Sequence, residues 1–286
     1  MITPVGLDLL TDSGTYPAAE KSLTRAESRL IASCMTAQGL RYVVADPTSA
    51  SATTPSAQVN LQRRRSQGYG LYEQYAPATG EPTPTPAANA SSSNDAYVRR
   101  LPAAQAAAYM TALRGGTSDL RTFRMSEGTL EFSVKGCEAD SRRRLYGSLT
   151  TYAELAAIPQ NLNATLTGPV QRDAAYKALM RKWSTCMAAQ GYHYALPSDA
   201  QARLKASYTR SGATRALRGR EIATAVADGT CALRLRIPSE VVAIRKRLAA
   251  SVLTTQQKSA MVELAKSWQK ATATAKEVVR QSGEAG

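Results

Sequence analysis

A nine-residue pattern occurs twice in this chain, as CMTAQGLRY from Cys34 and as CMAAQGYHY from Cys186. Before each copy, apolar residues recur at steps of three and four, which predicts an amphipathic helix with its cysteine on the buried side. Gly39 and Gly191 follow the last apolar residues, and glycine commonly ends a helix in the left-handed conformation. The repeat therefore predicts two helix ends of the same design, each leading into an extended segment with a core tyrosine.

The chain has four cysteines, and one cysteine outside the repeat follows each copy. Four cysteines allow three pairings. The internal repetition favours the pairing that joins each copy to the next cysteine, Cys34 with Cys137 and Cys186 with Cys231. Such bonds persist only in an oxidising compartment. The alternative is four unpaired cysteines in a cytosolic protein, while a zinc site is disfavoured because no CxxC or HxxxH spacing is present.

Composition and spacing predict a mainly α fold of two related helical halves, each closed by a disulfide, with a small β-hairpin in the first. Segments rich in alanine, leucine and arginine have helical spacing, and 286 residues suffice for a large core. We place the first half at 1–160, with a Pro/Ala/Ser-rich excursion at 47–96 and a hairpin near 121–135. The second half, 161–286, is predicted to be helical with basic C-terminal helices.

Finer predictions concern individual helices. Residues 137–157 are expected to form one helix that covers the hairpin, with Arg142, Arg143 and Arg144 mostly facing water. In the second half, helices are expected at 171–190, 198–209 with Ser198 as the N-cap, 215–236 and 239–281. The last is either one helix or a helical hairpin, because TTQQ at 254–257 is a candidate capping box.

The chain is basic, with 36 Lys and Arg against 22 Asp and Glu and a net charge of +14, most of it in the last third. This balance favours anionic partners, which include wall polymer, a membrane surface and nucleic acid. The candidate polyanion-binding residues are Arg63, Arg64, Arg65, Arg245, Lys246, Arg247, Lys258, Lys266 and Lys270. The alternative for such residues is a solvated helix face.

Three spaced tyrosines, Tyr69, Tyr72 and Tyr75, follow the first arginine triplet. A basic run with spaced tyrosines is compatible with a stacking platform for a single strand or a sugar. More often such a stretch is a loop that anchors itself to its domain through the tyrosines, and we favour this second interpretation.

No catalytic residue, metal ligand or cofactor site is predicted. The chain lacks the phosphate-binding, dinucleotide-binding, HExxH and EF-hand patterns, and its only histidine, His193, has no nucleophile motif beside it. A glycosidase would need two converging carboxylates, and the candidates Glu131, Glu138 and Asp140 are expected at the surface. No run of 18 apolar residues is present, so we expect no transmembrane helix, and no signal-peptide pattern begins the chain.

WSTCMAAQGYHYALPSDA at 183–200, followed by REIATAVADGTCALRLRI at 220–237, resembles a family of exported, often lipid-anchored actinobacterial proteins. These proteins show W-x-x-C-M-x-x-x-G-x-x-Y-x-x-P and then E-x-x-x-A-x-A-D-x-x-C. A weaker match covers SCMTAQGLRY and GCEADSRRRLYGSL in the first half. The resemblance implies export, two intrachain disulfides and a helical fold, and it carries no activity to transfer. This chain departs from the family in lacking a leader or a lipid-attachment cysteine near its start.

These observations predict a non-enzymatic extracytoplasmic binding or interaction protein at the cell envelope. Its expected partner is an anionic wall polymer, a membrane surface or another protein. The alternative is a nucleic-acid-binding protein that uses the basic C-terminal helices, for which free thiols are expected.

Overall fold

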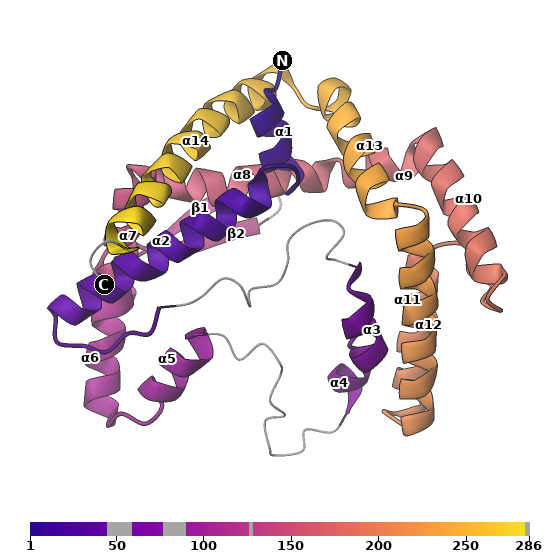
Figure 1. Cartoon of the computed structure of the whole chain (residues 1–286), viewed down its shortest axis with the longest axis horizontal. Helices are drawn as coiled ribbons and strands as arrows, with labels where there is room; N and C mark the ends of the chain where they lie inside the picture. Colours follow the sequence, from indigo (N-terminus) through magenta and orange to yellow (C-terminus); the bar gives the residue numbers. More distant parts are fainter. Residues whose placement is uncertain (45–58, 77–89, 126–127, 284–286) are drawn as a thin grey trace. The chain divides into compact units, whose positions relative to one another are not determined.

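The computed structural model describes residues 1–44, 59–76, 90–125 and 128–283 (Figure 1). These residues form a mainly α-helical chain with one two-stranded antiparallel sheet, which confirms the predicted fold class. Contacts divide the chain into two compact units, each assembled from stretches far apart in the sequence. We call them unit 1 and unit 2.

Unit 1 draws on both ends of the chain. It contains α1 (Pro4–Leu10), α2 (Tyr16–Ala37), α5 (Ala90–Val98), α6 (Ala103–Arg114), β1 (Leu120–Met125), β2 (Gly128–Ser133), α7 (Gly136–Tyr146), α8 (Leu149–Thr165) and α14 (Thr255–Gly283). Helices α2 and α14 lie side by side (Figure 1). The buried residues of α14 recur at helical spacing, from Met261 through Trp268 to Ala275, so one apolar stripe faces the unit's core.

The hairpin agrees with the sequence prediction. Leu120 pairs with Ser133 and Met125 with Gly128 in an antiparallel register. Residues on β2 alternate, because Glu131 is exposed while Phe132 is half-buried and meets the ring of Tyr152 on α8 edge-on, at 6.3 Å between ring centroids. Helix α8 thus covers the hairpin, which a two-stranded sheet needs for stability.

The single helix predicted at 137–157 is wrong. Two helices, α7 and α8, occupy this region, and α7 ends at Gly147, whose φ of +80° cannot continue an α-helix. Arg142 also departs from the prediction that it faces water. Its side chain is 17% exposed, lies 2.9 Å from the carboxylate of Glu27 and stacks over the ring of Tyr152 at 4.4 Å.

Unit 2 is wholly helical in its described part. It contains α3 (Leu61–Gln67), α4 (Leu71–Tyr75), α9 (Thr167–Arg172), α10 (Ala174–Ala188), α11 (Pro197–Ser211), α12 (Arg215–Arg234) and α13 (Ile237–Val252). Helix α12 is its centre, because α3, α4, α10, α11 and α13 all contact it. Its buried face mixes alanines with two acidic residues, Glu221 and Asp228.

The structure decides two helix boundaries in the second half of the sequence. The expected segment at 239–281 is two helices, α13 and α14, and Thr254 forms the capping box: its N–H donates to Oε1 of Gln257 at 2.9 Å, and its Oγ1 accepts from the N–H of Gln257 at 3.2 Å. The predicted N-cap at Ser198 is wrong. Helix α11 already begins at Pro197, after the N-cap Leu196, because proline is favoured in the first turn.

The division into two units differs from the predicted boundary at residue 160. Helix α14 belongs to unit 1, although it lies at the end of the predicted second half. Helices α3 and α4 belong to unit 2, although they lie in the 47–96 segment that we assigned to the first half. The rest of that segment up to 89 lies outside the described residues.

Candidate functional sites

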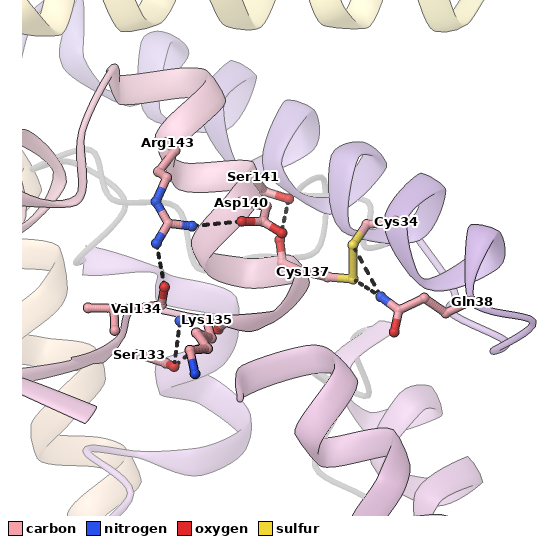
Figure 2. A network of polar contacts seen from close by, with 9 residues as sticks. All are labelled: Cys34, Gln38, Ser133, Val134, Lys135, Cys137, Asp140, Ser141 and Arg143. Carbon is pink, nitrogen blue, oxygen red and sulfur yellow. Dashed lines mark hydrogen bonds and ion pairs between the residues drawn. A yellow bond between two sulfur atoms is a disulfide. The ribbon is translucent and has the colours of Figure 1, made fainter. Parts of the chain in front are cut away.

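The two copies of the repeated pattern form the same local structure. Cys34 is bonded to Cys137 and Cys186 to Cys231, with Cα atoms 5.6 and 5.9 Å apart, as the repetition predicted. All four cysteines are used. The glutamine of each copy reaches back to its disulfide: Nε2 of Gln38 lies 3.2 Å from Sγ of Cys137 (Figure 2), and the amide of the second copy lies 2.9 Å from Sγ of Cys231.

The remaining residues of the pattern also have structural roles. Gly39 and Gly191 have φ of +72° and +82°. In each copy the N–H after the glycine donates to the carbonyl of the methionine five residues earlier, which closes the helix end. Both methionines are fully buried, and both tyrosines pack in the cluster that contains their disulfide. The pattern is therefore a disulfide-bonded helix end.

The similarity of the two halves stops at this motif. Cys137 lies in the first turn of α7, whereas Cys231 lies in the last turn of α12. The two partner helices therefore approach their disulfides from opposite ends. The repeat explains the cysteine pairing, but the described elements around the two copies are different.

The substitution Gly191→Ala is expected to lower the free energy of unfolding by about 1 kcal/mol, because an added Cβ disfavours the left-handed conformation. Nothing lies within 4 Å of that Cβ, so no steric clash contributes. Gly219→Ala is the matched control, since this exposed glycine lies inside α12 with equally open surroundings and alanine there should stabilise the helix. Urea denaturation measures the change in the free energy of unfolding for both variants. A change of the same sign in both would contradict the role of Gly191 as a left-handed helix end.

Figure 2 shows how the residues around Cys137 join the hairpin to α7. Ser141 donates to the carbonyl oxygen of Cys137 at 2.7 Å, and Arg143 bridges Asp140 and the carbonyl oxygen of Val134. Ser133 Oγ accepts from the N–H of Lys135 at 3.2 Å. These contacts fix the entry to α7 and thereby the position of the buried cysteine.

The carboxylates considered from sequence for glycosidase chemistry do not form a site. Asp140 is paired with Arg143 at 2.7 Å, and Glu138 lies 2.9 Å from Arg114. Glu131 is exposed on β2. His193 is exposed in the stretch between α10 and α11.

The predicted polyanion-binding residues are distributed over both units. Arg63, Arg64 and Arg65 lie on α3 and Arg245, Lys246 and Arg247 on α13, all in unit 2, whereas Lys258, Lys266 and Lys270 lie on α14 in unit 1. Several are engaged within the protein: Arg247 pairs with Asp173 at 2.8 Å and Lys266 with Glu263 at 2.8 Å. Burial lowers the pKa of Arg245.

Arg64 and the neighbouring tyrosines face the protein, in agreement with the anchoring interpretation. Nη1 of Arg64 lies 2.6 Å from Oδ2 of Asp228, which also accepts from the hydroxyl of Tyr69 at 3.0 Å. Oδ1 of Asp228 accepts from the indole N–H of Trp183 at 2.9 Å. Burial and the charge of Asp228 raise the pKa of Tyr69, so its hydroxyl stays a donor. Tyr75 stacks on Tyr208, with ring centroids 5.5 Å apart.

A second buried carboxylate, Glu221, holds the turn between α3 and α4. Its Oε1 accepts from the N–H groups of Tyr69 and Leu71, both at 2.8 Å. Its Oε2 accepts from the N–H of Tyr72 at 3.0 Å and from the hydroxyl of Tyr208 at 2.6 Å. Each partner is a donor, so the four bonds satisfy a fully buried carboxylate. We assign a structural role to this network, which attaches α3 and α4 to α12.

Unit 1 contains a cavity of about 200 Å³ that sequence reasoning missed. Two acidic and four aromatic side chains are among those that line it, namely Asp12, Glu20, Tyr16, Tyr146, Tyr152 and Trp268. Tyr16 and Glu20 are four residues apart on α2 and therefore share a face of the helix. Asp12 lies in the turn between α1 and α2 with φ of +47°.

The acidic residues of this cavity are electrostatically coupled. Partial burial, together with the charge of Glu20, raises the pKa of Asp12 to about 6. The hydroxyl of Tyr16 donates to Oε1 of Glu20 at 3.3 Å, and burial with both acidic charges raises the pKa of this tyrosine. The ring of Tyr16 stacks on Trp268, with centroids 4.9 Å apart. The four-residue step from Tyr16 to Glu20 indicates a shared face of α2, but only the tertiary structure adds Asp12 and Trp268.

No group of three or more His, Cys, Asp or Glu side chains among the described residues is arranged to hold a metal ion. Among the same residues, no helix combines the length and the apolar character that crossing a bilayer requires.

Comparison with known proteins found no match to a protein-family model, to a curated protein or to a solved structure. The resemblance to exported actinobacterial proteins accordingly remains a prediction from the motifs.

Proposed function

We propose that this protein is a non-enzymatic binding protein that acts outside the cytoplasm, at the cell envelope. The observation that carries the proposal is the use of all four cysteines in two disulfides. Structural disulfides of this kind are maintained in oxidising compartments and are rare in the cytosol. They favour an extracytoplasmic protein over the nucleic-acid-binding alternative, for which free thiols are expected.

The net charge of +14 supports an anionic partner, either wall polymer or a lipid surface. Arg63 and Arg65 are exposed on α3, and Lys266 and Lys270 are exposed on α14. Arg64 is not available to an anionic partner, because its guanidinium is paired with the carboxylate of Asp228. The exposed residues of each unit therefore offer the contacts that a flexible polyanion could use.

Binding to long-chain polyphosphate should weaken at least tenfold between 50 and 500 mM NaCl, because added salt screens surface charges. Arg63→Ala combined with Arg65→Ala should weaken it at 50 mM NaCl. The control combines Arg99→Ala with Arg100→Ala, which removes the same charge from exposed positions outside the predicted set. Fluorescence anisotropy with labelled polyphosphate measures all three proteins, and equal losses in both variants would show dependence on net charge instead of on α3.

Two further measurements separate the alternatives. Protein secreted into an oxidising compartment should show no free thiol when alkylated under denaturing conditions, whereas four free thiols would remove the argument for export. Anionic vesicles and a single-stranded oligonucleotide, compared with polyphosphate at equal salt, test the partner class. A strong preference for the oligonucleotide would favour the nucleic-acid alternative.

One observation favours a second candidate function. Asp12 and Glu20 place two carboxyl groups at one cavity, and burial and charge raise the pKa of Asp12 to about 6. Two carboxyl groups at one site, one of them with a raised pKa that suits a general acid, are the combination that glycoside hydrolases use. Release of reducing sugar from envelope glycan by the native protein, abolished by Glu20→Gln, would establish this activity. No release would leave the cavity as a binding site.

A further inference from the structure

The cavity of unit 1 is suited to a small ligand. Its volume of about 200 Å³ is below the roughly 300–1,000 Å³ typical of pockets for drug-sized molecules. Its walls come from the turn between α1 and α2, from α2, from Tyr146 at the end of α7, from α8 and from α14. These five parts of unit 1 must be folded together for this cavity to exist.

The charge of the lining is negative, although the protein as a whole is strongly basic. Asp12 and Glu20 are the charged residues among the described residues that line the cavity, which include no lysine, arginine or histidine. The carboxylate of Asp12 has no hydrogen bond or ion pair with any described residue, its burial disfavours the ionised form, and the negative charge of Glu20 repels it. An anionic ligand would be repelled, and a neutral ligand would leave this repulsion in place. A cation would relieve it.

The aromatic side chains favour an organic cation over a metal ion. Ammonium groups are attracted to the faces of tryptophan and tyrosine rings. Tyr16 and Trp268 form one stacked pair. The ring centroids of Tyr146 and Tyr152 lie 5.3 Å apart, and the guanidinium of Arg142 already stacks on the ring of Tyr152. A metal ion is less well served, because Asp12 and Glu20 are the only two acidic side chains among the described lining residues and no group of three or more His, Cys, Asp or Glu side chains there could hold one.

We propose that the cavity lined by Asp12, Tyr16, Glu20 and Trp268 binds a small organic cation that carries a primary or quaternary ammonium group. The ammonium group lies between the two carboxylates, and the alkyl part lies against the aromatic side chains. This site is separate from the exposed basic residues. The protein would therefore bind two ligands of opposite charge, the polyanion of the proposed function and an organic cation in this cavity. Choline is a suitable probe, because 3,3-dimethylbutan-1-ol has the same shape without the charge.

Calorimetry with the full-length oxidised protein at pH 8 should detect choline binding. The neutral alcohol should bind at least tenfold more weakly, and Asp12→Asn and Glu20→Gln should each weaken choline binding at least tenfold. Glu263→Gln is the matched control, because it removes the same charge from an exposed position on α14 outside the cavity and should leave binding unchanged.

Binding should also weaken between pH 8 and pH 5, as Asp12 becomes protonated. The other titratable groups at the cavity are Glu20 and Tyr16 of α2, Tyr146 of α7 and Tyr152 of α8. Burial raises the pKa of each of these three tyrosines, so they stay neutral throughout. Helix α14 contributes Trp268, which does not titrate. Asp12 therefore controls the pH dependence.

Thermal unfolding distinguishes a binding role from a structural one. A carboxyl group with a raised folded-state pKa makes folding less favourable as pH rises through the interval between its two pKa values. Asp12→Asn removes this penalty, so its thermal unfolding midpoint should exceed that of the native protein at pH 8, and the difference should disappear as pH falls below 3.8, the ordinary pKa of the carboxyl group. Loss of choline binding together with greater stability at pH 8 excludes unfolding as the cause.

Three results would overturn the proposal: no choline binding at 100 mM, equal binding of the neutral alcohol, or binding of N-acetylglucosamine in place of choline. The last result would favour the glycan-directed candidate for the same cavity. None of them bears on the polyanion experiment, whose test variant lies on α3 in unit 2 and whose control positions, Arg99 and Arg100, do not line the cavity.

Discussion

Replacing Cys34 and Cys137 together by alanine is expected to reduce the free energy of unfolding of unit 1 by up to about 5 kcal/mol. Replacing Cys186 and Cys231 should cost unit 2 up to about 4 kcal/mol. The difference arises because the first bond spans 103 residues and the second 45, and in the chain-entropy model a longer closed loop loses more entropy in the unfolded chain. Domains are typically stable by about 5–15 kcal/mol, so either loss is severe.

Hydrogen exchange followed by mass spectrometry locates each effect. The first variant should lose protection in α2, α7 and α14, which contact one another in unit 1, and the second in α10 and α12 of unit 2. The native protein in reducing buffer is the control and should show both losses. A loss below 1 kcal/mol in both double variants would mean that the bonds do not constrain the unfolded chain.

Glu221→Ala is expected to lower the free energy of unfolding of unit 2 by about 3–5 kcal/mol, within the range for breaking a buried charged network. The substitution leaves the N–H groups of Tyr69, Leu71 and Tyr72 without their acceptor, and also the hydroxyl of Tyr208. Glu221→Gln should not restore stability, because all four partners are donors and the new amide would present a donor to some of them.

Glu73→Ala is the matched control for this prediction. Glu73 is a glutamate of the same unit, on α4, but its side chain is 48% exposed and lies 3.6 Å from Arg218. Its removal should change stability by less than about 0.5 kcal/mol. Urea denaturation gives the energies, and limited proteolysis should cleave the Glu221→Ala protein first between residues 59 and 76. Equal stability of the two variants would refute the role assigned to Glu221.

The features predictable from sequence are those set by neighbouring residues. The helix ends at Gly39 and Gly191 follow from a glycine after an amphipathic stripe, and the capping box at Thr254 follows from a four-residue pattern. The alternation on β2 identified the hairpin. The disulfide pairing was also accessible, because the repeat showed which cysteines have equivalent positions.

The cavity and the buried carboxylates depend on contacts that no local pattern encodes. Asp12 and Trp268 lie at opposite ends of the chain, and Glu221 meets Tyr69 across 152 residues. In sequence, Glu221 and Asp228 look like ordinary helix residues, since nothing nearby shows which donors will satisfy them when buried.

The sequence by itself thus determined the helical class, the positions of the two disulfide-bonded helix ends and the hairpin, because short-range hydrogen bonding and side-chain periodicity decide these features. Only the tertiary structure decided that α14 belongs with α2 and that α3 and α4 belong with α12. The physical reason is that apolar stripes are chemically alike and can pack against many partners. Shape and the satisfaction of buried polar groups choose among those partners, and both exist only once the chain is folded.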